Sequence, residues 1–468
     1  MINLFDFYTV ESKDLQFSQL VAGQKYPTVV LHDDGFLPDD VTSPLKYYLQ
    51  LAGEELVGKP RYFNQIDLPR YWAIEANGSG GKLMDMGIQR GRITFATTDN
   101  SRPVKTVEWF DRNGRVRVVD HYNQWGFKHA VTDYDEAGHP TLTTYLTRAG
   151  QEIVVSNHLT GQLVYYQPNG KPRFFNNQTE IIAYYLQQAD LDIRQINFNS
   201  LSTPLFVVQK LGAAVKHPRL FWQEPLQDAI PGNMQFILNG NLGPNAEIVV
   251  QTKAAYDNLR RLVADQPQQQ VQLSYLGYAY PFQRLNKERK EILILTNSDQ
   301  LVEIESLIKG LPDFHFAIAA VTEMSSKLMS LDHYANVDLY PTVATKTVRE
   351  LVAHADVYLD INRGNEILDA VRGAFENNML IMGFEETLHA PRYVAPVNRY
   401  QPAQVDQMVA DLQAVFAPGD QLENRLQAQW QAADRVVGRL PRLLCKALIQ
   451  GHAFRWESVF FFCENLAG

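Results

Sequence analysis

The sequence has few cysteines, no long apolar run and no excess of basic residues. Cys445 and Cys463 are the only cysteines in 468 residues, which is too few for a disulfide framework and typical of a reducing cytosol. No apolar run approaches the ~18 residues of a membrane span, and the N-terminus lacks the basic start and apolar core of a signal peptide. The net charge of −9 argues against nucleic-acid binding by phosphate neutralisation. We therefore expect a soluble, acidic, intracellular protein.

Common signatures of nucleotide, metal and hydrolase sites are also missing. The glycine-rich residues 78–81 lack the Lys-Ser/Thr ending of a phosphate-binding loop and are interpreted as a plain loop. There is no Gly-x-Ser-x-Gly elbow, and the 11 histidines form no His-x-x-x-His pair and no Cys/His cluster. Asp33 and Asp34 could form an acidic metal-binding pair, but Asp-Asp-Gly after a strand favours a turn. The sequence therefore predicts no metal and no cofactor.

Glycines recur at a regular spacing in the aromatic-rich part of the chain. Spacings of 12, 12, 12, 11 and 9 residues separate Gly114, Gly126, Gly138, Gly150, Gly161 and Gly170. Short alternating apolar runs lie between these turn sequences, a pattern typical of consecutive antiparallel hairpins. We predict an up-and-down β-meander over residues 61–180. We expect about six strands in one curved sheet, because the competing propeller needs more strands.

Elsewhere strand and helix patterns alternate, which is typical of parallel sheets covered by helices. The basic stretch 284–290 separates two such series and is interpreted as a solvated linker. The predicted fold is α/β, with two Rossmann-like domains and an inserted antiparallel β-meander. The first domain comprises residues 1–60 and 181–283, the second residues 284–436, and residues 437–468 form a C-terminal helical segment. Predicted strands include 27–31, 205–208, 219–222, 235–238, 247–250, 271–276, 291–295, 314–320, 337–340, 357–360 and 379–383. Predicted helices include 43–52, 178–188, 254–265, 301–309, 325–331, 345–354 and 366–376.

Several short strings resemble one protein family. They are residues 4–8 (LFDFY), 32–38 (HDDGFLP), 221–224 (FWQE), 230–234 (IPGNM) and 275–281 (YLGYAYP). They are similar to the glycosyltransferase-stabilising accessory subunit of the bacterial accessory secretory system, and the resemblance covers essentially the whole chain. It implies a GT-B arrangement of the two domains and a cytoplasmic, non-catalytic subunit. It also implies a hetero-oligomer with a transferase that adds O-GlcNAc, or glucose, to serine-rich repeat adhesins. In that family this subunit binds the Ser/Thr-rich acceptor polypeptide.

The residues that the resemblance implies for catalysis are missing. Active glycosyltransferases of this fold carry Arg and Lys after the first strand of the second domain, whereas residues 296–300 (TNSDQ) contain no cation. Active relatives also carry two glutamates eight positions apart, and Ile361 and Asp369 stand at these places. Glu366 could substitute by a register shift. We expect a degenerate subunit that is not an enzyme, and the alternative is an active nucleotide-sugar-dependent transferase with an atypical diphosphate site.

The turn after the predicted strand 357–360 is the candidate acceptor-peptide site. Ligands of parallel sheets bind beyond the carboxyl ends of the strands, and a strand-to-helix turn favours anion or peptide contacts. We expect Asn362, Arg363, Asn365 and Glu366 to line this cleft. The alternative is ordinary helix capping.

Aromatic side chains of the meander are candidates for the surface that binds the catalytic subunit. Strand alternation places some of them on the outer face, where exposed aromatic groups mark interaction surfaces. The alternative is that they fill the sheet's own core. The candidates are Trp109, Tyr122, Trp125, Phe127, Tyr134, Tyr145, Tyr165 and Tyr166.

The C-terminal residues 443–462 are apolar and aromatic, with Arg442, Lys446 and Arg455 in and beside them. One interpretation is a helix on the cytoplasmic face of the membrane, which would give peripheral membrane association. The other, which the fold favours, is a helix that packs back on the first domain.

Overall fold

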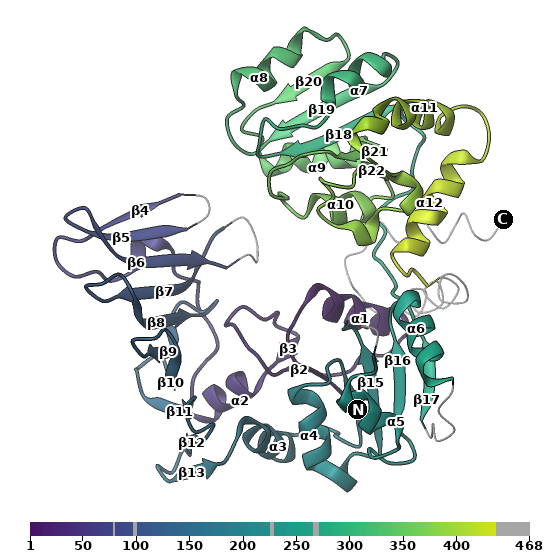
Figure 1. Cartoon of the computed structure of the whole chain (residues 1–468). Helices are drawn as coiled ribbons and strands as arrows, with labels where there is room; N and C mark the ends of the chain where they lie inside the picture. Colours follow the sequence, from purple (N-terminus) through teal and green to yellow (C-terminus); the bar gives the residue numbers. More distant parts are fainter. Residues whose placement is uncertain (78–79, 97–100, 225–228, 265–270, 437–468) are drawn as a thin grey trace. The chain divides into compact units, whose positions relative to one another are not determined.

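The computed structural model describes residues 1–77, 80–96, 101–224, 229–264 and 271–436 (Figure 1). These residues divide into two compact units. The first comprises Met1–Gln16 and Lys25–Leu276, and the second comprises Phe17–Gln24 and the residues from Gly277 onward. The predicted C-terminal helix, with Cys445 and Cys463, lies outside the described residues. In the described ranges, no helix is long and apolar enough to cross a membrane.

The first unit contains a parallel sheet of seven strands in the order β17-β16-β15-β14-β1-β2-β3. Successive residues of its strands point to opposite faces, so Leu4 and Val29 enter one apolar cluster while Phe5 and Val30 enter another. Burial on both faces is typical of a doubly wound sheet. The strands are β1 (Ile2–Phe5), β2 (Thr28–Val30), β3 (Val41–Thr42), β14 (Gln195–Phe198), β15 (His217–Trp222), β16 (Glu247–Val250) and β17 (Gln272–Tyr275). The helices are α1 (Val10–Val21), α2 (Pro44–Leu51), α3 (Gln178–Gln188), α4 (Thr203–Leu211), α5 (Gly232–Leu238) and α6 (Lys253–Val263).

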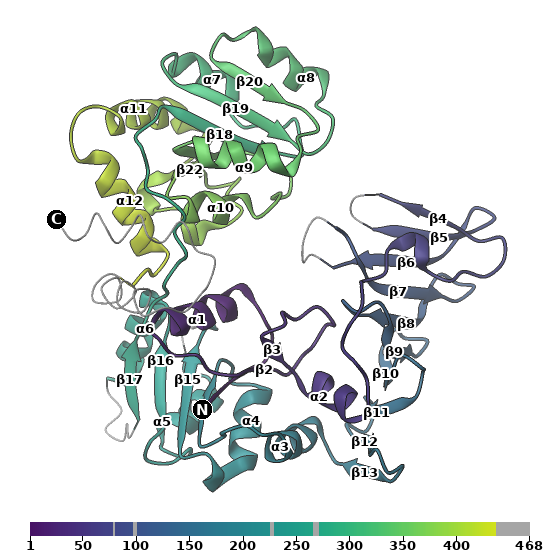
Figure 2. The ribbon, with the colours of Figure 1, turned by 180° about the vertical axis from the view of Figure 1, so that it is seen from behind.

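Between α2 and α3 the chain forms one antiparallel sheet in which each strand pairs with the next along the chain (Figures 1 and 2). The sheet has ten strands, so the expectation of six was wrong. The six glycines of the repeat have φ between +74° and +84°, as their turns require. The strands before Gly114 lie within the predicted range of residues 61–180 but carry no such repeat, so the number of strands was underestimated. The strands are β4 (Ala73–Ala76), β5 (Gly81–Asp85), β6 (Ile88–Phe95), β7 (Val104–Phe110), β8 (Val116–Tyr122), β9 (Lys128–Tyr134), β10 (Pro140–Leu146), β11 (Glu152–Asn157), β12 (Leu163–Tyr166) and β13 (Pro172–Phe175).

The last strands of the meander share a core with helices that precede and follow it. Leu163, Tyr165 and Phe175 belong to the apolar cluster that also contains Tyr48 of α2 and Ile181 of α3. The rings of Tyr48 and Tyr165 lie 4.4 Å apart, and the Tyr48 hydroxyl donates a hydrogen bond of 3.2 Å to the Ile181 carbonyl. This part of the meander therefore belongs to the folded body of the first unit.

Two predicted strands of the first unit are helices. Residues 205–208 lie in α4 and residues 235–238 lie in α5. Both are short apolar runs, whose periodicity cannot separate a buried strand from a buried helix. Pro204 stands in the first turn of α4, where proline favours helix initiation.

The second unit contains a parallel sheet of six strands in the order β20-β19-β18-β21-β22-β23. The order reverses between β18 and β21, which makes this position the topological switch point where doubly wound proteins bind ligands. The confirmed fold class is thus α/β, with two Rossmann-like domains and an inserted meander. The strands are β18 (Glu291–Thr296), β19 (His315–Ala320), β20 (Val337–Tyr340), β21 (Val357–Asp360), β22 (Leu380–Phe384) and β23 (Arg399–Tyr400). The helices are α7 (Ile304–Gly310), α8 (Ser326–Met329), α9 (Thr345–His354), α10 (Ala370–Glu376), α11 (Val405–Val415) and α12 (Gln421–Ala432).

The basic stretch 284–290 is not a solvated linker, and that interpretation was wrong. The guanidinium groups of Arg284 and Arg289 both donate hydrogen bonds to the carboxylate of Asp356, which is fully buried. Asp356 immediately precedes β21, so the stretch is bound to the edge of the second sheet at the amino ends of its strands. A charge run whose cations have a buried partner is a structural element rather than a solvated surface.

Candidate functional site

The switch point of the second unit is closed by contacts between the loops that follow β18 and β21. Asn362 forms a bridge with Leu301, and the Arg363 amide donates a 3.1 Å hydrogen bond to the Gln300 carbonyl. A Cβ atom added to Gly364 would lie 2.1 Å from Oδ1 of Asn297, so only glycine fits there. The loops that follow β18 and β21 are therefore joined directly to each other at the switch point.

His389 joins the end of β21 to the same loop. Its Nδ1 lies 2.5 Å from Oδ1 of Asp360, and its Nε2 lies 2.7 Å from the Gly364 carbonyl oxygen. With Asp360 ionised both partners are acceptors, and the imidazolium, which has two N–H donors, then satisfies both contacts. Burial alone would lower the pKa of His389, but the hydrogen bonds to Gly364 and Asp360 raise it. His389 thus joins the candidate acceptor loop to the end of β21.

Of the four residues predicted for acceptor binding, two are buried or half-buried and support the loop, and the other two are exposed. Asn362 is buried, and its Oδ1 accepts the Gly364 amide at 2.9 Å. Glu366 is half-buried, and its Oε1 accepts the amide of Val371 at 2.9 Å, which is the capping role considered as the alternative. Arg363 and Asn365 are exposed. Of the four predicted residues, only these two have exposed side chains.

Charge at this site differs from that of a diphosphate site. Arg363 is ion-paired with Glu386, and no cation follows β18 within residues 297–300. Burial raises the pKa of Glu366, and the Val371 amide and His389 offset this only in part. Leu368 and Asp369, which come just before α10, both have left-handed backbone angles, with φ of 56° and 48°. The loop therefore has a fixed and strained shape without the charge that would hold a leaving diphosphate.

Three of the predicted partner-surface aromatics lie in the core of the first unit. Tyr122, Phe127 and Tyr165 are buried, so the structure corrects their assignment to an exposed surface in favour of the alternative. Trp125 and Tyr145 are partly buried and pack against the same core as Tyr165. Sequence alternation could not separate the faces, because β-bulges shift the register in β7, β8 and β10.

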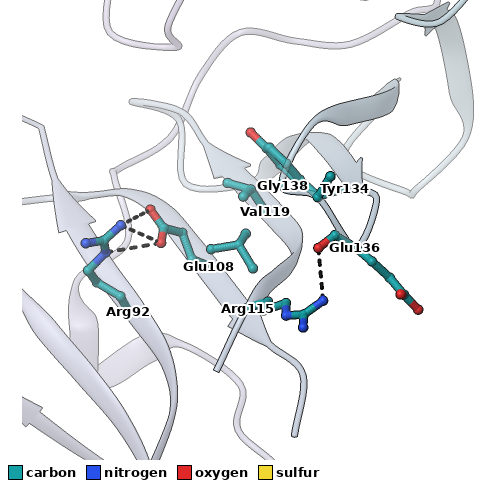
Figure 3. Close-up of a pocket in the computed structure, with 9 residues that line it drawn as sticks. Arg92, Glu108, Arg115, Val119, Tyr134, Glu136 and Gly138 are labelled. Carbon is teal, nitrogen blue, oxygen red and sulfur yellow. Dashed lines mark hydrogen bonds and ion pairs between the residues drawn. The ribbon is translucent and has the colours of Figure 1, made fainter. Parts of the chain in front are cut away.

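The remaining candidates, Trp109, Tyr134 and Tyr166, keep exposed surface. Tyr134 borders a groove of about 370 Å³ on the meander (Figure 3). On one side of this groove Arg92 donates three hydrogen bonds to the carboxylate of Glu108, and on the other side Arg115 donates one to the Glu136 carbonyl at 3.1 Å (Figure 3). The groove therefore offers an aromatic ring between charged groups.

Exposed apolar residues of the meander were missed by the sequence analysis. Phe174 on the edge strand β13 has 74% of its surface exposed, and Met86 in the β5–β6 turn has 87% exposed. Ile88 and Tyr71 near Met86 are exposed as well. No sequence signal distinguished these residues from core residues, because they follow the same apolar alternation.

Comparison with solved structures first defines the structural class of the protein. The fold is that of glycosyltransferase-like proteins: the crystal structure of the pneumococcal O-GlcNAc transferase GtfA with UDP and GlcNAc matches 96% of this chain at a TM-score of 0.52 and 13% identity. A chain in the crystal structure of a GtfA/B complex bound to UDP and GlcNAc is much more similar. It matches 97% of this chain and 100% of that chain at a TM-score of 0.88 and 40% identity.

The particular family follows from the sequence relatives. The stabilising protein GtfB of Streptococcus gordonii is 40% identical over 96% of this chain and 99% of its own length, and that of Streptococcus pneumoniae is 41% identical over 93% and 97%. The chain belongs to the GtfB family. The family models match as the GtfB N-terminal domain at residues 2–48, the middle domain at 72–176, the third domain at 178–262 and the GftB/GlyA-F C-terminal domain at 292–429.

Proposed function

We propose that this chain is the non-catalytic stabilising subunit of a protein O-glycosyltransferase complex in the cytoplasm. Its partner is a GtfA-type transferase, and together they modify Ser/Thr-rich adhesins before export. The observation that carries this proposal is the match, at 40% identity over 97% of the chain, to a chain in the crystal structure of a GtfA/B complex. The two cysteines, which are too few for a disulfide framework, agree with a cytoplasmic location.

The absence of catalysis by this chain is supported by the switch point of the second unit. Transfer from a nucleotide sugar needs groups that stabilise the charge on the leaving diphosphate. Here the loop after β18 carries no cation, and Glu366 is engaged by the amide of Val371. The chemistry is therefore assigned to the partner.

The meander is proposed as the surface that binds the transferase. Its outermost strands β4 and β13 end the sheet, and Phe174 and Tyr166 of β12–β13 are exposed. Exposed aromatic groups beside a sheet edge suit pairing with another sheet. Binding of a folded partner stabilises that partner by mass action.

Acceptor binding is proposed for the loop that follows β21. Arg363 and Asn365 are exposed there, while Asn362 and Glu366 fix the loop. An unfolded acceptor loses conformational entropy on binding, so we expect a modest affinity. Fluorescence anisotropy of a Ser/Thr-rich peptide with the complex should show binding that Asn365→Ala weakens.

The docking test is co-purification with a tagged GtfA-type transferase from the same organism. The wild-type chain should be retained, whereas the chain with Tyr166→Ser and Phe174→Ser, or with residues 61–172 replaced by a Gly/Ser linker, should be lost. The matched control is Met329→Ala, an exposed residue of α8 in the second unit. Undiminished retention of both altered chains would exclude the meander as the interface.

A further inference from the structure

A row of imidazole and hydroxyl groups crosses the middle of the meander. Nε2 of His121 on β8 lies 3.0 Å from Oγ1 of Thr132 on β9, and that oxygen lies 2.9 Å from Oγ1 of Thr143 on β10. The Thr143 oxygen in turn lies 2.7 Å from Nε2 of His158, which follows β11. We call these four residues the imidazole–hydroxyl row.

The row leads from the surface of the meander to its interior. His158 lies in the turn between β11 and β12 and is exposed, so its ring can exchange protons with solvent. It forms no ion pair with any residue that the structure describes, and its backbone amide donates to the Thr141 carbonyl at 2.9 Å. Thr132 and Thr143 are buried and stand opposite each other in the register of β9 and β10. The row is therefore a hydrogen-bonded path from an exposed ring to the inside of the sheet.

The three hydrogen bonds of the row fix the number of its protons. Each link needs one proton, and each threonine hydroxyl carries one proton and can donate it to only one neighbour. Two of the three protons therefore come from Thr132 and Thr143, and the third comes from Nε2 of one terminal histidine. Protons on both Nε2 atoms would make two donors face each other, and a row with neither would leave one link unmade. When all three links are made, one and only one of the two Nε2 atoms carries a proton.

The surroundings of His121 keep its ring neutral. Burial lowers the pKa of His121, while Asp120 on the same strand opposes this in part and Lys105 on β7 adds to it. The ring of His129 on β9 lies 6.3 Å away and is neutral as well, because burial lowers its pKa to about 3 and Asp34 opposes this only weakly. A neutral ring has one N–H group, which His121 carries either at Nε2 or at Nδ1.

We propose that the imidazole–hydroxyl row is a pH-sensitive device in which protonation of His158 sets the tautomer of His121. The neutral row can run in either direction. An imidazolium at His158 has protons on both nitrogens, so its Nε2 donates to Thr143, and Thr143 then donates to Thr132. Thr132 donates to Nε2 of His121, which must carry its N–H at Nδ1. The row gains one proton in total, at His158, and His121 stays neutral while it exchanges an N–H at Nε2 for one at Nδ1.

The device lies within the meander and needs no partner chain, so the test is NMR of the full chain with isotope-labelled histidine. Protonated and unprotonated ring nitrogens differ clearly in chemical shift, which gives the tautomer of each ring. As pH falls through the titration of His158, the Nε2–H form of His121 should drop to about one tenth of the Nδ1–H form or less, the equivalent of one lost hydrogen bond. At higher pH, whichever of the two rings carries N–H at Nε2, the other should carry it at Nδ1.

Variants of the middle of the row show whether the coupling runs through its hydroxyl groups. Thr143→Val removes the hydroxyl and keeps the shape of the side chain, so the Nε2–H form of His121 should persist when His158 is protonated. Thr143→Ser keeps the hydroxyl and should restore the wild-type behaviour. The matched control is Thr94→Val, which removes a hydroxyl from the Thr94–Thr106 pair of β6 and β7, outside the row. It should behave like the wild type.

Three results would contradict the coupling. The first is a wild-type His121 that keeps its N–H at Nε2 while His158 is protonated, and the second is an N–H at both Nε2 atoms at higher pH. The third is a Thr143→Val chain with the same tautomers as the wild type at each pH. Should Thr143→Val fail to fold, Thr132→Val breaks the row at its other hydroxyl and decides the same question.

Discussion

Nη1 of Arg284 donates a hydrogen bond of 2.6 Å to Oδ1 of Asp356, whose side chain is fully buried. Arg289 binds the other oxygen of the same carboxylate at 2.9 Å. Burial alone would raise the pKa of Asp356, but the hydrogen bonds from Arg289 and Arg284 lower it. The segment that enters the second unit is thereby fixed to the start of β21, the strand whose other end carries the candidate acceptor loop.

Removing this carboxylate should destabilise the second unit. Asp356→Asn leaves two buried or half-buried guanidinium groups without their counter-charge, which should lower the free energy of unfolding by about 3–5 kcal/mol. Urea denaturation of the full chain measures this change. Glu305→Gln, which removes an exposed pair with Lys309 on α7, is the control and should cost less than about 0.5 kcal/mol. Equal urea midpoints for the two variants would show that the hydrogen bonds of Arg284 and Arg289 to Asp356 do not stabilise the unit.

Acid should weaken the meander through His129. Burial lowers the pKa of His129 to about 3, and His121 nearby adds to this effect. The unfolded chain, with a His pKa near 6.5, binds the proton more readily, so stability is full above pH 6.5 and falls as pH drops toward 3. This predicts a loss of about 2 kcal/mol between pH 7 and pH 5.

The check is the urea midpoint at pH 7 and pH 5 for the wild type and His129→Gln. The variant should lose most of this pH dependence, whereas His139→Gln, at an exposed turn of the same sheet, should keep it. Identical pH dependence in the wild type and His129→Gln would contradict the assignment.

The stability that His389 contributes should change with pH in the opposite direction to that of His129. Its pKa is raised in the folded chain, so the stabilisation it gives is complete below pH 6.5 and is lost as pH rises through the folded pKa. An NMR titration of the His389 ring should therefore give a value above 6.5. Asp360→Asn removes the negative partner 2.5 Å away and should lower that value. A midpoint at or below 6.5 in the wild type would mean that the ring does not hold the loop as the imidazolium.

Nucleotide sugars should neither bind to nor react with the isolated chain. Asn297 and Gly364 close the switch point, and no cation follows β18 within residues 297–300. A thermal-shift titration with UDP-sugars should be flat, whereas a ligand at 100 times its Kd would add about 2.7 kcal/mol of stability. Turnover by the pure chain that Glu366→Gln or Asp369→Asn abolishes would restore the alternative of an active enzyme.

The meander could be predicted because its signal is local. Glycine at a tight turn is required by the backbone angle of that one residue, and the six spaced glycines all adopt positive φ. The strands before Gly114 carry no such repeat, although Met86 and Gly87 form a turn there with φ of 45° and 83°. The sequence analysis therefore placed the sheet within residues 61–180 and underestimated the number of its strands.

Features that depend on distant partners could not be predicted. Arg284 looked like a solvated cation because Asp356 is 72 positions away in the sequence. The apolar run in α4 looked like a strand because its length and composition fit both structures. Strand β14 was missed because its polar Asn197 is buried and bonded to Asn3 of β1, a contact made only after the sheet forms.

The candidate acceptor loop was likewise predictable only in part. Its position after β21 follows from the alternation of strands and helices, so the place of the four residues in the fold could be predicted, and their contact with an acceptor stays a prediction. Their structural roles could not be predicted, because His389, which comes 25 positions after Gly364, decides how the loop is held.

The stability of the GtfA-type transferase, with and without this chain, tests the central claim most directly. The thermal midpoint of the purified transferase should rise by about 3 °C when this chain is present at 100 times its Kd, because binding then adds about 2.7 kcal/mol. The Tyr166→Ser, Phe174→Ser double variant should give little of this rise at the same concentration. A transferase whose midpoint and activity are the same with and without the wild-type chain would contradict the account.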